Sequence, residues 1–236
     1  MENLKGKEHP LSILANEAYQ AFADMGFEIA LRPEVESEWY NFDILNMPKD
    51  HPARDMQDTF WIKNQKEKVL RTHTTCVTAW ATEQAAKAGR MPNAFISVGK
   101  VFRNEATDVT HEMQFFQIDG SMLGTTEVGI SLAHMKAVLT NFYKKMLGDD
   151  IEIEFRPSFF PFTEPSIEVY AKFNGKWLEM MGGGMTNPAV IRNMGLDPSK
   201  VQGFCFGGGL DRIAMIKWGI PDVRLFYQGD LRLNQF

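Results

Sequence analysis

The sequence around Asn174-Gly175 constrains the fold more than any other part of the chain. Residues 167–173, which read Ile-Glu-Val-Tyr-Ala-Lys-Phe, place an apolar residue at every second position up to this dipeptide, and residues 151–155 do the same. A period of two puts these side chains on one face of a strand. Asn-Gly favours the type I′ turn that joins two antiparallel strands. We therefore expect a β-hairpin here, with residues 176–180 as the returning strand.

Helical spacing and further β-rich runs surround this hairpin. Apolar residues recur every three or four positions over residues 11–25 and 128–146, and residues 75–88 are rich in alanine, so each range predicts a helix. Residues 94–103 and 113–123 predict two strands joined by a polar loop. Because strands follow one another instead of alternating with helices, the pattern predicts an α+β fold, an antiparallel sheet flanked by helices.

Length and composition exclude several classes of protein. A chain of 236 residues with 44% hydrophobic content predicts one domain, residues 1–236. A net charge of −5 lacks the basic footprint of an autonomous nucleic-acid binder. Cys76 and Cys205 are far apart and lack metal-ligand spacing, so neither a zinc site nor a disulfide framework is expected. With no apolar run of about 18 residues, we expect a cytoplasmic protein that makes no membrane contact.

The first segment with chemical potential is the strand predicted at residues 113–123. Its alternation places Phe115, Gln117 and Asp119 on one face, an aromatic ring, an amide and a carboxylate in a row. Polar groups interleaved on a face that should be buried indicate a ligand site. A solvated sheet face is the alternative.

The second segment, residues 159–165, reads Phe-Phe-Pro-Phe-Thr-Glu-Pro. Its prolines favour an edge or rim over a central, fully paired strand. If the segment is extended, Phe160, Phe162 and Glu164 lie on one side, which suits an apolar pocket beside a charged one. Core packing of the aromatic rings explains the same pattern equally well.

The third segment, residues 203–215, predicts a strand, a glycine turn and a helix. Arg212 falls in the first turn of that helix, where free N–H groups and the helix dipole favour an anion such as phosphate. The glycine triplets 182–184 and 207–209 match neither the dinucleotide nor the P-loop fingerprint.

Together the three segments supply arginines for phosphate, an aromatic ring for a purine, carboxylates and an aromatic pocket. Adenylate formation needs this set, because a carboxylate oxygen attacks the α-phosphate and catalysis consists largely of positioning and charge neutralisation. The reaction requires no side-chain nucleophile, and the sequence contains no convincing serine or cysteine triad.

These residues also resemble known motifs. Arg103 with residues 105–120 resembles motif 2 of class II aminoacyl-tRNA synthetases, and Gly-Gly-Gly-Leu-Asp-Arg at 207–212 resembles motif 3. From about His9 to the last residue, the chain is similar to bacterial phenylalanyl-tRNA synthetase alpha subunits. Further matching motifs are Pro-Glu-Val-Glu-Ser-Glu (33–38), Asp-Thr-Phe-Trp (58–61), Arg-Thr-His-Thr (71–74) and Phe-Pro-Phe-Thr-Glu-Pro (160–165).

The resemblance implies activation of L-phenylalanine with ATP and Mg²⁺ and transfer of the product to tRNA(Phe). It also implies a beta subunit partner or a homodimer. The family dimerises through a region that corresponds to residues 28–45 here. That region overlaps residues 33–52, whose pattern fits either a strand or an interface loop. The family's coiled-coil arm has no counterpart before the core in this sequence, so we expect poor aminoacylation without a partner chain.

The resemblance also assigns roles to single residues. Arg103 would hold the α-phosphate and the amino-acid carboxylate, Phe115 would stack on adenine, and Arg212 would bind the terminal phosphate. The remaining nucleotide-site candidates are Glu105, His111 and Glu179, and the magnesium ligand, shared with the beta subunit, is Glu164. The phenylalanine-site candidates are His73, Thr74, Thr75, Gln117, Asp119, Phe160, Phe162 and Cys205.

The sequence departs from the family at four positions. Phe116 and Asn187 stand where the family has His, Asp119 where it has Glu, and Cys205 where it has Ala. The shorter Asp119 should reach the ammonium less easily, and the bulkier Cys205 should reduce the space beyond the para position. One alternative is therefore a paralogue that adenylates another amino acid. A second is a non-catalytic scaffold, which would have no need for the intact phosphate and metal residues.

Overall fold

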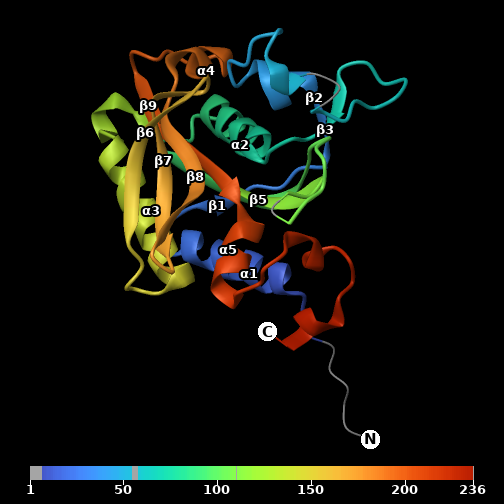
Figure 1. Ribbon diagram of the computed structural model, residues 1–236. Coiled ribbons are helices and arrows are strands. Elements are labelled where there is room, and N and C mark those ends of the chain that lie inside the picture. Colours follow the sequence, from blue (N-terminus) through green and yellow to red (C-terminus); the bar gives the residue numbers. More distant parts are fainter. Residues whose placement is uncertain (1–6, 55–57, 110, 236) are drawn as a thin grey trace, which may run out of the picture.

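A mixed sheet forms the centre of the computed structural model, which describes residues 7–54, 58–109 and 111–235. Within these residues the sheet has seven strands in the order β1-β4-β5-β9-β8-β7-β6 (Figure 1). Every neighbouring pair is antiparallel except β1 with β4, which is parallel. The strands are β1 (Glu28–Ile29), β4 (Asn93–Phe102), β5 (Gln114–Thr125), β6 (Ile153–Phe160), β7 (Thr163–Phe173), β8 (Lys176–Thr186) and β9 (Val201–Gly209). The α+β fold is confirmed, with β1 as the parallel exception.

Helices cover both faces of this sheet. The main apolar core lies between one face, with Ile96, Ile118 and Phe204, and the helices α1 (Pro10–Ala23), α3 (Leu132–Leu147) and α5 (Leu210–Trp218). The alternate residues of the strands face the other way. There α2 (Thr75–Lys87) packs its own small core against Phe95, and α4 (Pro188–Asn193) lies beyond it. None of the described helices is long and apolar enough to cross a membrane.

Of the three helices predicted with full residue ranges, two have nearly the expected bounds and the third begins late. Residues 11–25 and 75–88 correspond to α1 and α2, whereas α3 starts at Leu132 and not at Val128. The reason is local. Gly129 has a φ of 68°, which ends the short 3₁₀ turn η3 (Thr126–Val128), and Ser131 then opens α3 with a capping box.

The predicted hairpin at Asn174-Gly175 is confirmed. Both residues have positive φ, 49° and 77°, as a type I′ turn requires, and Phe173 pairs with Lys176 across it. The returning strand β8 continues well past Met180. The glycine turn expected at 207–209 was wrong, because β9 runs through all three glycines and α5 begins at the next residue.

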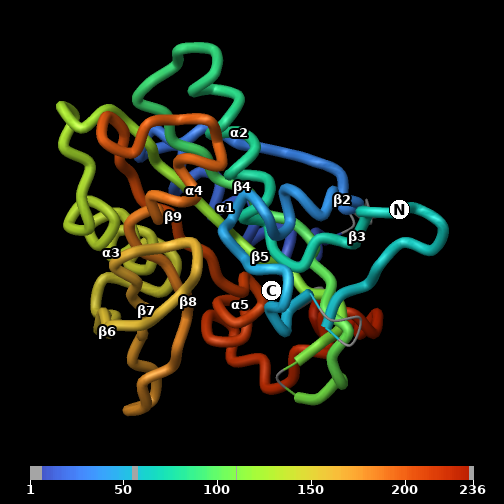
Figure 2. Tube along the Cα trace, turned by 90° about the horizontal axis from the view of Figure 1, so that it is seen from above, coloured from blue at the N-terminus to red at the C-terminus, as the bar shows by residue number. Residues whose placement is uncertain are grey.

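Residues 33–52 form a small projection beside the main sheet. Strand β2 (Val35–Ser37) pairs antiparallel with β3 (Lys68–Leu70), and Figure 2 shows this pair at one side of the molecule. A π-helical turn η1 (Trp39–Asp43) and a 3₁₀ turn η2 (Pro52–Arg54) follow. The segment is thus part strand and part helical turn. Two 3₁₀ turns near the C-terminus, η4 (Val223–Phe226) and η5 (Leu231–Gln235), complete the described elements.

Candidate active site

A cavity of about 1200 Å³ opens on the sheet face that carries α2. It extends across β5, β8 and β9 to the first turn of α5, so the three segments singled out in the sequence meet around it. Thr74 lies directly behind the wall, and Glu164 is exposed and lies outside the lining. The lining includes the other candidates: His73, Thr75, Arg103, Glu105, His111, Phe115, Gln117, Asp119, Phe160, Phe162, Glu179, Cys205 and Arg212.

The glycines of β9 make room for the polar face of β5. Gln117 pairs with Gly209 and Asp119 with Gly207 in the antiparallel register. A Cβ atom at position 207 would lie 1.9 Å from Oδ1 of Asp119, far inside van der Waals contact. Gly207 is therefore required by the carboxylate beside it, and no turn is involved.

Asp119 is the least exposed acid of the cavity lining. It is only 1% exposed, and the hydroxyls of Thr74 and Thr75 donate hydrogen bonds to its two oxygens. Burial raises its pKa to about 6, although these bonds act in the opposite direction. Nearby, the buried Oε1 of Gln117 has no hydrogen-bond partner among the described residues. A carboxylate and an unsatisfied amide oxygen are the acceptors that an ammonium group requires.

His73 is fixed in one neutral form. Its Nε2 lies 2.8 Å from the carbonyl oxygen of Asn41, which can only accept, so Nε2 carries the proton. Its Nδ1 therefore accepts the N–H of Cys76 at 3.3 Å, in the first turn of α2. Burial lowers the pKa of His73 to about 4. The ring orients the start of α2 and lines the cavity, and both its nitrogens are already engaged.

Two aromatic rings form the apolar end of the cavity. Phe160 and Phe162 stack with centroids 5.6 Å apart and an interplanar angle of 10°. The chain is not continuously extended here: β6 ends at Phe160, β7 begins at Thr163, and Glu164 is exposed and outside the cavity lining. Strand β6 is at the sheet edge, as the prolines predicted, whereas residues 163–165 lie in the interior strand β7, where the register with β8 shifts between Thr163 and Ser166. Gly182 lies under Phe160, because a Cβ there would be 2.6 Å from the ring.

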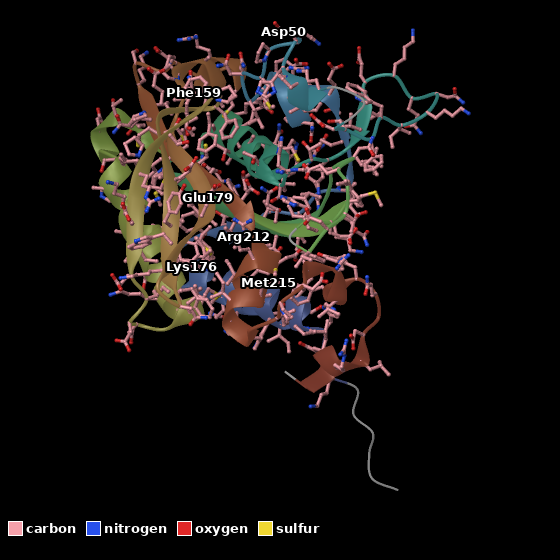
Figure 3. The ribbon with its side chains drawn as sticks, in the orientation of Figure 1. Asp50, Phe159, Lys176, Glu179, Arg212 and Met215 are labelled. Atoms are coloured by element: carbon pink, nitrogen blue, oxygen red, sulfur yellow. The ribbon has the colours of Figure 1, made fainter. Side chains whose placement is uncertain are left out.

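The opposite end of the cavity carries two arginines among several acidic residues. The Arg103 guanidinium lies 5.1 Å from the Phe115 ring centroid, and its Nη1 is 3.9 Å from Glu105. Arg212, in the first turn of α5, donates from Nη1 to the carbonyl oxygen of Glu179 at 2.6 Å. Figure 3 shows these last two residues together at the centre of the molecule. Two exposed cations and an aromatic face are the groups that bind a nucleoside phosphate.

Residues 1–236 match the family described as tRNA synthetases class II core domain (F). The chain belongs to this family. It is 46% identical over 246 residues to the phenylalanine–tRNA ligase alpha subunit of Anoxybacillus flavithermus, covering 98% of this chain and 69% of that protein. The Clostridium perfringens alpha subunit is 46% identical over 244 residues, with the same coverage. The chain is thus a member of the phenylalanine–tRNA ligase alpha subunit family.

A solved structure supports the same fold. The crystal structure of pyrrolysyl-tRNA synthetase from Desulfitobacterium hafniense aligns with a TM-score of 0.74, covering 94% of this chain and 74% of that chain. At 17% identity, this likeness concerns the fold alone.

Two departures from the family pattern have structural roles that leave the cavity unchanged. Asn187 caps α4, because its side chain accepts the N–H of Ala189 at 2.8 Å. Phe116 packs against the main core, on the opposite face of β5 from the cavity. The other two, Asp119 and Cys205, line the cavity itself. Cys205 also borders a second cavity of about 20 Å³.

Asp211 is a cavity residue that the sequence reasoning missed. It is 4% exposed, accepts the Phe116 N–H at 3.2 Å and accepts the Tyr227 hydroxyl at 2.7 Å. Burial raises its pKa to about 7. Its position beside Arg212, within the segment resembling motif 3, was a usable signal. Nothing in the sequence pattern pointed to Tyr227.

Proposed function

We propose that this chain activates L-phenylalanine with ATP to form phenylalanyl-adenylate and transfers the phenylalanyl group to tRNA(Phe). The observation that carries the proposal is the layout of one cavity. Its aromatic end and its ammonium acceptors lie on the same sheet face as two arginines suited to phosphate. The names of the similar alpha subunits agree with this substrate.

In this proposal the amino acid lies across β5. Its phenyl ring occupies the space beside Phe160 and Phe162, with Cys205 at the far wall, and its ammonium pairs with Asp119 and Gln117. These contacts leave the substrate carboxylate within reach of Arg103. The two aromatic rings offer edge and face contacts to a phenyl group, and such contacts contribute about 0.5–1.5 kcal/mol beyond burial.

The chemistry then depends on alignment. A carboxylate oxygen of phenylalanine attacks the α-phosphorus of ATP, the bond from that phosphorus to the bridging oxygen breaks, and pyrophosphate leaves. Arg103 neutralises charge on the α-phosphate while Phe115 stacks on the adenine. Arg212, supported by the α5 N-terminus, holds the terminal phosphate. Glu105, His111 and Glu179 complete the nucleotide side.

Class II synthetases use ATP and a divalent metal, and the residues of this cavity fit Mg²⁺ in part. The described residues contain no group of three or more potential ligands. Mg²⁺ commonly needs only one or two carboxylates, because phosphate oxygens and water supply the rest. We propose Glu179, which lines the cavity, as one ligand. Glu164 is exposed outside the cavity and suits a metal shared with a second chain. The ion would neutralise phosphate charge.

We further propose that a partner chain, a beta subunit or a second copy, docks on the region of residues 28–45. This region exposes large apolar side chains, Ile29, Leu31, Val35 and Trp39. With a net charge of −5, the chain has little general attraction for tRNA, so the partner would supply much of the binding. The buried, unpaired cysteines fit our proposal of a cytoplasmic location.

The test is phenylalanine-dependent exchange of pyrophosphate into ATP, run beside tyrosine, leucine and no amino acid. Exchange with phenylalanine alone supports the proposal. Exchange with another amino acid instead would identify a paralogue of different specificity. Absence of exchange even after a beta subunit is added would identify a non-catalytic relative.

A further inference from the structure

The chain that follows α5 forms part of the wall on the nucleotide side of the cavity. Gly219, Ile220 and Val223 contribute to the lining. The Val223 N–H donates to the carbonyl oxygen of Val109 at 3.0 Å. Figure 2 shows this red segment beside the green loop between β4 and β5. That loop carries Glu105 and His111, so the segment contacts one side of the nucleotide site directly.

A second contact links the same segment to the other side of the site. The Tyr227 hydroxyl donates to Oδ2 of Asp211 at 2.7 Å, and this carboxylate also accepts the backbone N–H of Phe116 at 3.2 Å. Asp211 directly precedes Arg212, and Phe116 directly follows Phe115. One buried carboxylate therefore connects the neighbours of the phosphate-binding arginine and the adenine-stacking ring.

We propose that Tyr227 is a positioning residue for ATP: by holding the Asp211 carboxylate on the Phe116 N–H, it fixes Phe115 relative to Arg212. This inference rests on the proposed function of the cavity. Tyr227 is not itself part of the cavity lining, so it acts through Asp211.

Because Asp211 is buried, the loss of the hydrogen bond from Tyr227 should have a large effect on its carboxylate. At 4% exposure the carboxylate has almost no access to water, so its acceptor sites depend on protein donors. Burial raises the pKa of Asp211 to about 7, and the hydroxyl of Tyr227 opposes that shift. Without the hydroxyl, the carboxylate gains a proton or rotates toward solvent, and its bond to Phe116 weakens. The position of β5 relative to α5, and so of Phe115 relative to Arg212, is then less well fixed.

The phenylalanine end has separate support. Asp119 is held by Thr74 and Thr75 from the start of α2, and none of these three residues contacts Asp211 or Tyr227 through a hydrogen bond in the described structure. Loss of the Tyr227 hydroxyl should therefore weaken ATP and leave phenylalanine binding unchanged. A general loss of structure would weaken both.

The experiment compares Tyr227→Phe with Tyr40→Phe in the whole chain. Tyr40 is a matched control, because its hydroxyl also donates to a carboxylate, that of Glu83, at 2.7 Å, and it is outside the cavity lining. Calorimetric titration gives the Kd of ATP and of L-phenylalanine for each protein. We expect Tyr227→Phe to raise the ATP Kd about tenfold, as the loss of a hydrogen bond to a charged group implies. The phenylalanine Kd should stay within about twofold, a tolerance that allows for small relaxation, and Tyr40→Phe should change neither.

A double variant tests the route of the effect. Because Tyr227 acts through Asp211, Asp211→Asn combined with Tyr227→Phe should weaken ATP no more than Asp211→Asn alone. Equal weakening of both ligands, additive effects in the double variant, or an unchanged ATP Kd in Tyr227→Phe would each overturn the positioning role. If the unsubstituted chain binds neither ATP nor phenylalanine, the proposed function and this inference both fail. If it binds both and Tyr227→Phe behaves like Tyr40→Phe, only the inference fails.

Discussion

The two ends of the cavity are built in different ways. At the end that we propose for phenylalanine, Asp119 is 1% exposed and held by two threonine hydroxyls, and Phe160 packs over Gly182, where a Cβ atom would not fit. At the end that we propose for the nucleotide, the Arg103 side chain is 41% exposed, and Arg212 is exposed and donates a hydrogen bond to the carbonyl oxygen of Glu179. The first end is preorganised by packing. The second exposes its arginine side chains to solvent. The buried Asp211 carboxylate beside it accepts hydrogen bonds from the Phe116 N–H and the Tyr227 hydroxyl.

The largest effect is expected from a substitution at the end proposed for the nucleotide. Arg212→Ala removes an exposed cation that supports little of the fold, so we expect kcat/KM for ATP in the exchange reaction to fall on the order of a thousandfold. The thermal midpoint should be unchanged. Arg192→Ala, which removes another exposed arginine on α4, is the control and should leave exchange intact. Full exchange activity in Arg212→Ala would show that phosphate binds elsewhere.

The next largest effect is expected when one methyl group is added to β9, at Gly207 or at Gly209. A Cβ at Gly207 would collide with Asp119, whereas a Cβ at Gly209, two residues along the same strand, meets no atom within 4 Å. Displacing a binding group by about 1 Å can cost about a hundredfold, so Gly207→Ala should raise the KM for phenylalanine by that order. It should also destabilise the fold by about 1–3 kcal/mol. Chemical denaturation should show no such loss for Gly209→Ala, and equal stability of the two variants would contradict the packed description of the phenylalanine end.

These glycines also show how far the sequence could predict the structure. The hairpin at Asn174-Gly175 follows from local rules of turn geometry, and the shared face of Phe115, Gln117 and Asp119 follows from strand periodicity. The glycines at 207–209 were misassigned to a turn. Gly207 instead leaves room for Asp119 and Gly208 for the backbone of β8, whereas a Cβ at Gly209 would meet no atom within 4 Å. Such contacts join strands that are distant in sequence, and no local pattern encodes them.

The candidate site was similarly only partly predictable. Motif resemblance pointed to many of the polar and aromatic residues that line the cavity, but only the folded structure shows that Glu164 is exposed and lies outside the lining that contains Phe160 and Phe162. The Tyr227–Asp211 contact spans 16 residues and has no periodic signature. Burial, which decides the protonation of Asp119 and His73, likewise depends on the whole fold.

The pH dependence of phenylalanine binding should sharpen the comparison further. Burial raises the pKa of Asp119 from 3.8 to about 6, so the acid loses its charge as the pH falls below 6. Because only the ionised form pairs with an ammonium group, the Kd of phenylalanine should rise about tenfold for each pH unit below that value. Titration calorimetry between pH 5 and 8 measures this, and Asp119→Asn should bind weakly with a flat profile.

Fold stability should follow the opposite trend with pH. The folded state favours the protonated form of Asp119, so its contribution to the free energy of unfolding is complete below pH 3.8 and is lost as the pH rises through about 6. Comparing denaturation of the unsubstituted chain and Asp119→Asn across this range isolates the contribution. If the unsubstituted chain instead gained stability relative to Asp119→Asn as the pH rises, the pKa of Asp119 would not be raised in the folded state.

The smallest expected effect tests how closed the phenylalanine end is. Cys205 borders both the main cavity and the second cavity of about 20 Å³, which Thr82 and Ser121 also line. Cys205→Ala should connect the two and raise kcat/KM for para-chlorophenylalanine relative to phenylalanine by a few-fold, because one buried atom in an apolar pocket gives only limited discrimination. Cys76→Ala also removes a buried sulfur, but at a site outside both cavities. This variant should keep the ratio of kcat/KM for para-chlorophenylalanine to that for phenylalanine unchanged. A shift of equal size in both variants would mean that general loosening of the fold, and not the wall formed by Cys205, limits the space beyond the para position.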